Sequence, residues 1–172
     1  MKSVYLLTGL PGTGKTTLIK EVVKTLGSKA GGFYTEEVRS GGTREGFRIV
    51  TLDGKTALLA HVDIRSEYRV GKYSVDIAGL EKVGVEALKE AARQREVVVI
   101  DEIGRMELFS ASFKNTVREI IDRGRKVLGT VLLKSDPWAD TIKQKPQVQL
   151  LVVTRNNHRE ILEQIKKWLQ TG

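Results

Sequence analysis

The chain has 172 residues, no cysteine and two histidines, and its 29 basic and 21 acidic residues give a net charge of +8. This composition excludes disulfides, thiolate catalysis and a histidine metal cluster. The length indicates a single domain over residues 1–172, and no apolar run approaches the ~20 residues of a membrane span, so we expect a soluble, cytoplasmic protein with no membrane partner. The positive charge favours anionic partners such as nucleotides or nucleic acid.

The first predicted elements are a strand over residues 3–8, a glycine loop, and a helix over residues 15–26. Three β-rich runs separated by the glycine turns SGGT and DGK come next, and they predict a small antiparallel insertion at about residues 31–62. Apolar residues at helical spacing then predict a helix over residues 80–94, which leads into an apolar strand over residues 96–100.

The second half of the chain alternates helices and strands. A helix containing Phe113 and Ile121 ends at Gly124, and strands are predicted at residues 126–133 and 148–154. Asn157 is predicted to cap the last helix, with Glu160 as its capping-box partner. Repeated strand–helix units predict an α/β fold of three layers, a mostly parallel sheet flanked by helices on both faces. Ligands of such folds bind at the C-terminal ends of the strands.

The segment GLPGTGKT, Gly9 to Thr16, matches the phosphate-loop pattern G-x-x-x-x-G-K-[ST] between a predicted strand and a predicted helix. In this setting the loop N–H groups and the helix N-terminus bind phosphate oxygens. Lys15 is then expected to reach the β and γ phosphates, and the Thr16 hydroxyl to bind Mg²⁺. A glycine turn with an incidental lysine is the alternative interpretation.

The apolar run VVVI ends on two adjacent carboxylates. A carboxylate at the tip of a buried strand usually completes the Mg²⁺ shell of a phosphate loop, so we expect Asp101 to bind the metal together with Thr16. Glu102 is predicted to orient or deprotonate an attacking water, which makes Lys15 and Glu102 the predicted catalytic residues; a surface or helix-capping role is the alternative for Glu102. The predicted nucleotide-binding residues are Gly9, Leu10, Pro11, Gly12, Thr13, Gly14, Lys15, Thr16, Thr17, Val97, Val98, Val99, Ile100, Asp101, Glu102, Ile103 and Gly104.

Several nearby residues have two open interpretations. Arg105 and Glu107 could contact the phosphates, or they could form a plain ion pair at the start of a helix. Thr130 could place its hydroxyl near the γ phosphate, or it is simply a threonine on a strand. Arg155 and Asn156 could bind the base, since they follow the last strand at the same rim of the sheet.

The predicted insertion is rich in arginine. Arg39, Arg44 and Arg48 could cover the nucleotide or contact a second substrate, or they could lie on the wet face of an antiparallel sheet. His61 lies in an apolar run and is predicted to be structural.

The motifs TGLPGTGKTTL, GGFYTEEVR, REGFRIVTLDG, GKYSVD, VVVIDEIGRMEL, LGTV and VTRNNHREIL occur in this order over nearly the whole chain. Together they resemble the THEP1 family of nucleoside-triphosphatases. The resemblance implies a small P-loop domain and slow, Mg²⁺-dependent hydrolysis of ATP, GTP and other nucleoside triphosphates to the diphosphate and phosphate, with broad tolerance of the base. It places the phosphate loop at Gly9–Thr16 and the acidic strand at Val97–Gly104.

Two other functions fit parts of the sequence. A P-loop nucleotide or small-molecule kinase would use an acceptor in place of water, but the segment after Leu133 carries no arginine-rich lid. A nucleic-acid-associated ATPase would fit the net charge of +8 and the basic insertion. The sequence predicts no particular oligomeric state.

Overall fold

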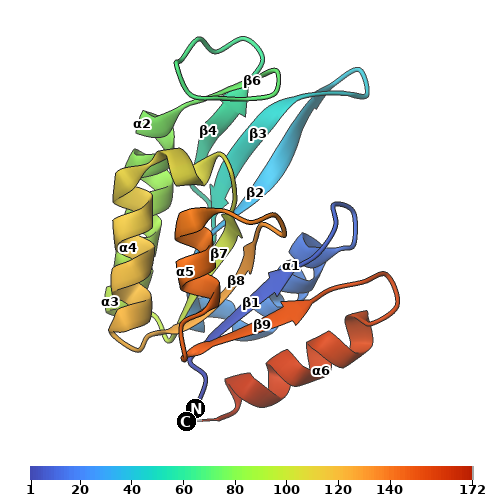
Figure 1. Ribbon diagram of the computed structural model, residues 1–172, viewed down its shortest axis with the longest axis vertical. Helices are drawn as coiled ribbons and strands as arrows, with labels where there is room; N and C mark the ends of the chain where they lie inside the picture. The colour runs from blue at the N-terminus through green and yellow to red at the C-terminus, as the bar shows by residue number, and fades with distance from the viewer. Residues whose placement is uncertain (172) are drawn as a thin grey trace.

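A computed structural model describes residues 1–171, which form one mixed sheet with helices on both of its faces (Figure 1). The nine strands follow the order β5-β6-β4-β3-β2-β7-β8-β1-β9 across the sheet. The strands are β1 (Val4–Thr8), β2 (Ala30–Ser40), β3 (Thr43–Thr51), β4 (Thr56–His61), β5 (Arg69–Val70), β6 (Tyr73–Val75), β7 (Val97–Ile103), β8 (Lys126–Val131) and β9 (Val148–Val152).

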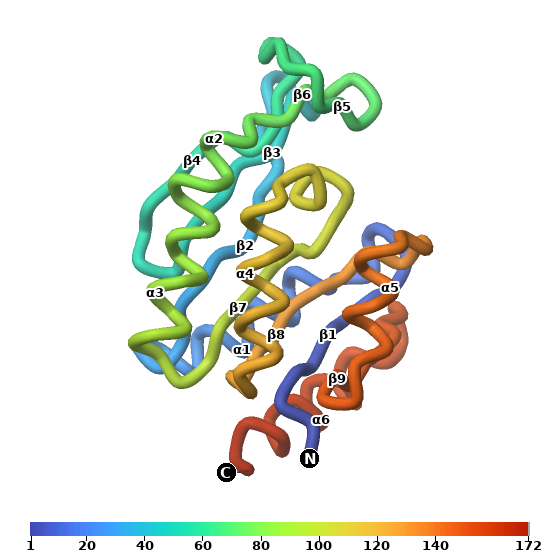
Figure 2. The backbone as a smooth tube through the Cα atoms, turned by 60° about the vertical axis from the view of Figure 1, so that its left-hand side comes forward, coloured from blue at the N-terminus to red at the C-terminus, as the bar shows by residue number. Residues whose placement is uncertain are grey.

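Helices cover the sheet in two layers, so the three-layer α/β prediction is confirmed. On one face α1 and α6 pack on a core that includes Leu7, Val99 and Leu151, and on the other face α3, α4 and α5 pack on a core that includes Leu6 and Ile100 (Figure 2). The helices are α1 (Lys15–Leu26), α2 (Ile77–Gly79), α3 (Glu86–Gln94), α4 (Ala111–Asp122), α5 (Pro137–Lys143) and α6 (His158–Leu169), with the 3₁₀ turns η1 (Gly27–Lys29) and η3 (Glu107–Phe109) and the π-helix η2 (Leu80–Val85).

The parallel half of the sheet consists of β9, β1, β8, β7 and the start of β2. Its strands are near-continuous apolar runs because helices cover both of their faces. The C-terminal ends of β1, β8 and β7 therefore meet at one rim, which places the loop after β1 beside the acidic end of β7. No helix within residues 1–171 has the length and apolar character needed to cross a membrane.

The antiparallel insertion predicted at about residues 31–62 is found as β2, β3 and β4, which span residues 30–61, but it is joined to the rest of the sheet differently at each end. The strand β2 belongs to both halves, since its residues 30–33 pair in parallel with β7 and its residues 33–40 pair antiparallel with β3. The antiparallel half also continues through β6 to Val75. Strands of two and three residues, such as β5 and β6, are too short to show an alternating pattern in the sequence.

Several other elements differ from the prediction. The predicted helix over residues 80–94 is η2 followed by α3, which begins at Glu86, and the two predicted strands at residues 126–133 and 148–154 each end two residues earlier. The strand β7 continues beyond residue 100 to Ile103, and its register against β8 shifts between Ile100 and Ile103. The helix α5 was not predicted, although Asp136 caps it and Pro137 begins it. Asn157 precedes α6 as expected, but the capping box is wrong. The Asn157 side chain makes no hydrogen bond to the helix. It turns back to the preceding loop, where it accepts from the Thr154 N–H and donates to the Val152 carbonyl oxygen.

Candidate nucleotide site

The loop between β1 and α1 folds tightly because two of its glycines permit it. Gly9 has φ 148° and Gly14 has φ 87°, a region that L side chains rarely adopt. A β-carbon on Gly9 would lie 2.5 Å from the carbonyl oxygen of Val153, and one on Gly14 would overlap the ring of His158. The loop is therefore held against the segment that follows β9, and larger residues at these two positions would push it away.

The helix α1 begins at Lys15, directly after this loop. Gly14 occupies the N-cap position without a side chain, so no side-chain oxygen competes for the N–H groups of the first turn. Such a helix start is an anion-binding site. The Lys15 ammonium donates to the carbonyl oxygens of Gly9 and Leu10, each at 2.9 Å, which holds its charge within the loop.

A pocket of about 330 Å³ opens over this loop. Its walls come from the loop, from α1 and from three strands, β2, β3 and β7. The lining residues are Gly12, Gly14, Lys15, Thr16, Thr17, Thr35, Glu36, Glu37, Phe47 and Glu102. The pocket thus combines an anion-binding helix start with three carboxylates, and it brings together the predicted site residues Lys15, Thr16 and Glu102.

Asp101 precedes Glu102 on β7 but does not line the pocket, since only 2% of its surface is exposed. Its Oδ1 accepts a hydrogen bond of 2.6 Å from the Thr130 hydroxyl, while its Oδ2 has no partner within residues 1–171. Burial raises the pKa of the Asp101 carboxyl, and the hydrogen bond from the Thr130 hydroxyl and the nearby Thr16 hydroxyl oppose that rise. Neither interpretation given above for Thr130 included this contact. The Thr130 hydroxyl holds the Asp101 carboxylate in place.

Glu102 follows Asp101 and lies in the wall of the pocket. The peptide bond between the two residues is cis. Gly104 makes room for the Glu102 side chain, because a β-carbon on Gly104 would lie 2.8 Å from its Cγ. Burial raises the pKa of the Glu102 carboxyl, the charge of Asp101 raises it further, and the Lys15 ammonium opposes both. The positive charge of Lys15 thus favours the ionised form of both carboxyl groups.

Not every predicted residue lines the pocket. Leu10 is 65% exposed and Pro11 is exposed, outside the pocket, while the Thr13 hydroxyl closes the loop by donating to the Leu10 carbonyl oxygen at 2.9 Å. Five residues of β7 are buried in the two cores and support the carboxylates without reaching the pocket. They are Val97, Val98, Val99, Ile100 and Ile103.

Arg105 and Glu107 do not form the ion pair that was one interpretation of this segment. Arg105 is exposed and has no ion-pair partner within residues 1–171, whereas Glu107 is 3% exposed. Burial raises the pKa of the Glu107 carboxyl well above its ordinary value, and the nearby charge of Glu102 adds to the rise. Backbone N–H groups of Glu107 and Glu102 oppose it.

The loop after β9 adjoins the phosphate loop. Arg155 and Asn156 are exposed there, while His158, the first residue of α6, packs its ring against Gly14. A ring nitrogen of His158, Nε2, is in hydrogen-bond contact with the Thr13 carbonyl oxygen. Since a carbonyl oxygen only accepts, Nε2 carries the proton. The sequence did not indicate this contact, which joins residues 145 positions apart.

Three arginines of the antiparallel half pair with glutamates of β2. Arg48 lies 2.9 Å from Glu36, and Arg39 and Arg44 lie 2.7 and 3.6 Å from Glu37. The pairs of Arg44 and Arg48 cross from β3 to β2, and the pair of Arg39 lies within β2. Glu36 and Glu37 also line the nucleotide pocket, so both predicted interpretations of these arginines stay open. His61 is half-buried, with its imidazole near Glu45 and Asp63, which agrees with a structural role.

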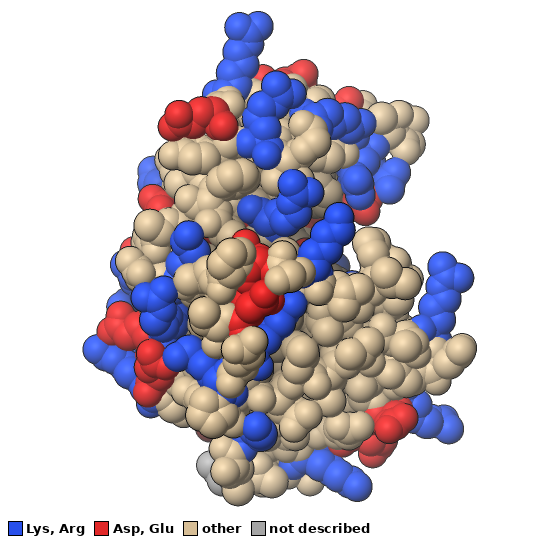
Figure 3. All heavy atoms as spheres, in the orientation of Figure 1, with Lys and Arg blue, Asp and Glu red and all other residues tan. Residues whose placement is uncertain are grey.

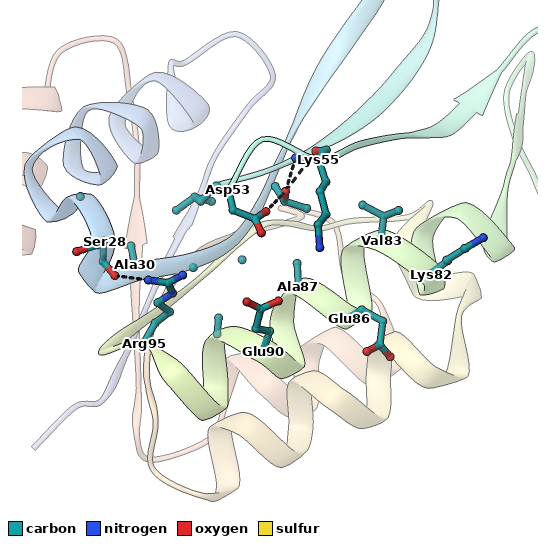
Figure 4. A pocket seen from close by; sticks show the side chains of 16 residues that line it. Ser28, Ala30, Asp53, Lys55, Lys82, Val83, Glu86, Ala87, Glu90 and Arg95 are labelled. Carbon is teal, nitrogen blue, oxygen red and sulfur yellow. Dashed lines mark hydrogen bonds between the residues drawn. The ribbon is translucent and has the colours of Figure 1, made fainter.

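Another cavity, of about 320 Å³, lies near the start of β2 and contains no residue of the phosphate loop. Figure 4 shows Asp53, Lys55, Glu90 and Arg95 around it. Two of these charges are already bonded within the protein. Asp53 accepts from the Thr51 hydroxyl, and Arg95 donates to the Ser28 carbonyl oxygen at 3.0 Å. We therefore place the nucleotide at the loop after β1.

The site has a glycine loop between a buried strand and a helix, and a lysine at the start of that helix. Acidic residues lie beside it on a parallel strand. These features define a P-loop nucleotide-binding protein. The model of the NTPase family matches residues 4–166 of this chain. The chain therefore belongs to this family of P-loop nucleoside-triphosphatases.

Similar proteins agree with this assignment. Nucleoside-triphosphatase THEP1 of Thermotoga sp. (strain RQ2) is 45% identical over 160 residues, covering 93% of this chain and 91% of the relative. The human cancer-related nucleoside-triphosphatase is 41% identical and covers 96% of both chains. The crystal structure of THEP1 from Aquifex aeolicus superposes with a TM-score of 0.90 at 39% identity, over 99% of this chain and 100% of that one. The predicted resemblance to the THEP1 family is thus confirmed.

Proposed function

We propose that the protein hydrolyses nucleoside 5′-triphosphates, including ATP and GTP, to the diphosphate and phosphate with the help of Mg²⁺. The observation that carries this proposal is the Glu102 carboxylate in the wall of the pocket that the phosphate loop forms. The relatives named as nucleoside-triphosphatases support the same reaction class.

The reaction follows from what each group of the chain can do. The loop N–H groups and the start of α1 bind the phosphate oxygens, and the Lys15 ammonium neutralises charge that develops between the β and γ phosphates. Glu102 holds a water by hydrogen bonding and accepts its proton as the water oxygen bonds to the γ phosphorus. The bond from that phosphorus to the bridging oxygen breaks, and the nucleoside diphosphate leaves with the electron pair.

Asp101 and Thr16 fit a magnesium ion beside the pocket. Asp101 Oδ2 is a buried carboxylate oxygen without a partner within residues 1–171, and the Thr16 hydroxyl is near enough to the same carboxyl group to oppose the rise of its pKa. No group of three or more histidine, aspartate or glutamate side chains in the described part of the chain could hold a metal alone. Mg²⁺ suits such a site, because it commonly takes one or two protein ligands and completes its shell with phosphate oxygens and water.

We assign the Mg²⁺ ligands of the chain to Thr16 and Asp101. When bound there, the ion supplies positive charge to the β and γ phosphates. Broad tolerance of the base is part of the same proposal, and the support for it is that Arg155 and Asn156 border the phosphate loop from an exposed segment. An exposed segment offers few fixed, desolvated partners for discriminating one base from another.

The test is the Glu102→Gln variant, which keeps the shape of the side chain but cannot accept a proton. We expect turnover of Mg·ATP to fall by about 10²- to 10⁴-fold, the usual contribution of a general base, while nucleotide affinity stays close to that of the wild type. The matched control is Glu86→Gln, an exposed residue on α3. Unchanged turnover in Glu102→Gln would remove Glu102 from the mechanism, and turnover that persists after chelation of divalent ions would remove Mg²⁺.

A further inference from the structure

A second cavity, of about 260 Å³, lies directly beside the nucleotide pocket. The two share three lining residues, Thr35, Phe47 and Glu102. Glu102 therefore stands at the boundary between the phosphate loop and a separate space. Hydrolysis requires room for a single water at this position, whose share of liquid volume is only about 30 Å³. The remaining volume is not explained by hydrolysis.

The walls of this cavity are mainly apolar. Five hydrophobic side chains from β3, β4, β5 and the segments after β7 and β8 line it: Phe47, Leu59, Val70, Met106 and Leu132. The other four lining residues are polar: Thr35, Glu102, Arg105 and Glu107. The apolar part of the lining suits the body of a small organic molecule, and the polar residues can bind its functional groups.

The rim of the cavity carries one cation without a partner. Arg105 lines the cavity, is exposed, and forms neither an ion pair nor a side-chain hydrogen bond within residues 1–171. A guanidinium in this position presents a fork of donors that matches a carboxylate or phosphate. The cavity thus joins the Glu102 carboxylate, which it shares with the nucleotide pocket, to an apolar wall and to the Arg105 guanidinium, and the buried Glu107 also lines it.

We propose that this cavity binds a small hydroxyl compound, with its hydroxyl at Glu102, its apolar body against Phe47 and Met106 and an anionic group at Arg105, and that the enzyme transfers the γ phosphoryl group to that hydroxyl. The inference rests on the proposed attack at the γ phosphate and replaces water by an alcohol. The alcohol oxygen forms a bond to the γ phosphorus while the bond to the bridging oxygen breaks. The nucleoside diphosphate keeps the electron pair, and the hydroxyl proton passes to Glu102.

The test uses three alcohols of equal length that differ in charge at the far end: ω-hydroxyhexanoate, hexanol and aminohexanol. Each is incubated with the wild-type protein and γ-labelled Mg·ATP, and the ratio of phosphate ester to inorganic phosphate is measured by chromatography and phosphorus NMR. We expect ω-hydroxyhexanoate to give the highest ratio, hexanol an intermediate one and aminohexanol the lowest. For ω-hydroxyhexanoate the ratio should exceed the molar ratio of alcohol to water by about tenfold or more, the discrimination that one favourable pocket contact gives.

Two variants connect this ratio to the cavity. Val70→Trp fills the cavity from the short edge strand β5 and should lower the ester ratio about tenfold, to that of the solvent composition. Val23→Trp is its control, a half-buried valine on α1 that packs in the opposite core and should keep the wild-type ratio. Arg105→Glu changes an exposed residue, so the fold should be kept. In this variant aminohexanol should give a higher ester ratio than ω-hydroxyhexanoate.

The outcomes separate this proposal from the proposed hydrolysis. If all three alcohols leave only inorganic phosphate while hydrolysis proceeds, the acceptor cavity is wrong and the hydrolase proposal stands. If neither ester nor phosphate forms, the hydrolase proposal itself has failed. An ester ratio that Val70→Trp and Arg105→Glu do not change would show transfer outside this cavity and would also overturn the inference.

Discussion

Glu107 illustrates how one buried side chain makes stability depend on pH. Its carboxyl group is 3% exposed and has no ion-pair partner within residues 1–171. Since burial raises its pKa in the folded state, its protonated form is favoured there. The stability that this group contributes is fully present below the pKa of the unfolded chain and is lost as pH rises toward the higher folded pKa.

The Glu107→Gln variant should remove this loss, because glutamine is neutral at every pH. We expect the free energies of unfolding of variant and wild type to be similar in acid and to diverge as pH rises, with the variant the more stable one. Urea unfolding followed by circular dichroism over a series of pH values measures both curves. The exposed Glu86→Gln control should run parallel to the wild type, and parallel curves for Glu107→Gln would contradict the prediction.

His158 is a positioning residue whose effect should appear in binding. Its Nε2 donates to the Thr13 carbonyl oxygen and its ring packs against Gly14, so it supports the phosphate loop from behind. In His158→Ala we expect nucleotide affinity to weaken by roughly two- to tenfold, the value of one hydrogen bond, with a smaller change in maximal turnover. Titration calorimetry and steady-state kinetics measure the two effects.

Two further variants interpret this result. His158→Gln retains an N–H donor and should recover part of the affinity, which a merely space-filling role would not predict. Lys166 is exposed on the same helix, so Lys166→Ala is the control and should bind nucleotide like the wild type. Equal affinity in His158→Ala and the wild type would show that the loop keeps its shape without the imidazole.

At the level of elements, Ser110 joins two helical segments by a single hydroxyl. Its oxygen accepts from the Phe113 N–H at 3.0 Å, which caps α4, and its proton goes to Glu81 Oε2 at 2.6 Å on η2. Ser110→Ala loses both bonds at a position that is 1% exposed. We expect the free energy of unfolding to fall by about 1–3 kcal/mol.

Urea unfolding measures this effect directly. The matched control is Ser40→Ala, since Ser40 is exposed at the end of β2 and should stay within about 0.5 kcal/mol of the wild type. A loss in Ser110→Ala no larger than that of the control would show that α4 does not depend on its cap.

The elements that were predictable are those whose pattern is local. The helix α1 was predicted at residues 15–26 and begins and ends there, because Gly14 and Gly27 flank a clear helical periodicity. The phosphate loop and the acidic end of β7 were recognisable for the same reason. Asn157 shows the limit of local reasoning, since its correct position as N-cap did not reveal that its side chain bonds backward to Thr154 and Val152.

What could not be predicted depends on contacts between distant parts of the chain. Thr35 and Phe47 line the nucleotide pocket because β2 and β3 pair beside β7, and no motif marks them. His158 meets the phosphate loop only after β9 pairs with β1. The helix α5 had a local signal in Asp136 and Pro137, but its seven residues are too few for a convincing periodicity.

For the molecule as a whole, the charge distribution bears on nucleic acid. Figure 3 shows Lys and Arg side chains over the visible face with Asp and Glu among them. In the antiparallel half, Arg39, Arg44 and Arg48 are paired with glutamates of β2 and are less available to replace counterions on a phosphate backbone. We therefore expect RNA and DNA to leave the hydrolysis rate unchanged at physiological salt.

Phosphate release from Mg·ATP, measured with and without single-stranded RNA or duplex DNA over a range of salt concentrations, checks this expectation. An uncharged polymer at the same mass concentration controls for crowding. Stimulation at low salt that fades as salt rises would instead identify a nucleic-acid-associated ATPase.

The strand β2 has a consequence for how this architecture can be divided. Its first residues pair with β7 in the parallel half, and its later residues pair with β3 in the antiparallel half. Dividing the protein between the two halves would therefore break the hydrogen bonds of β2 with one of these strands. Both the nucleotide pocket and the cavity beyond Glu102 also take walls from each side of that strand. The antiparallel half is consequently not a removable module grafted onto a P-loop core, and a minimal active fragment of this protein would have to keep it.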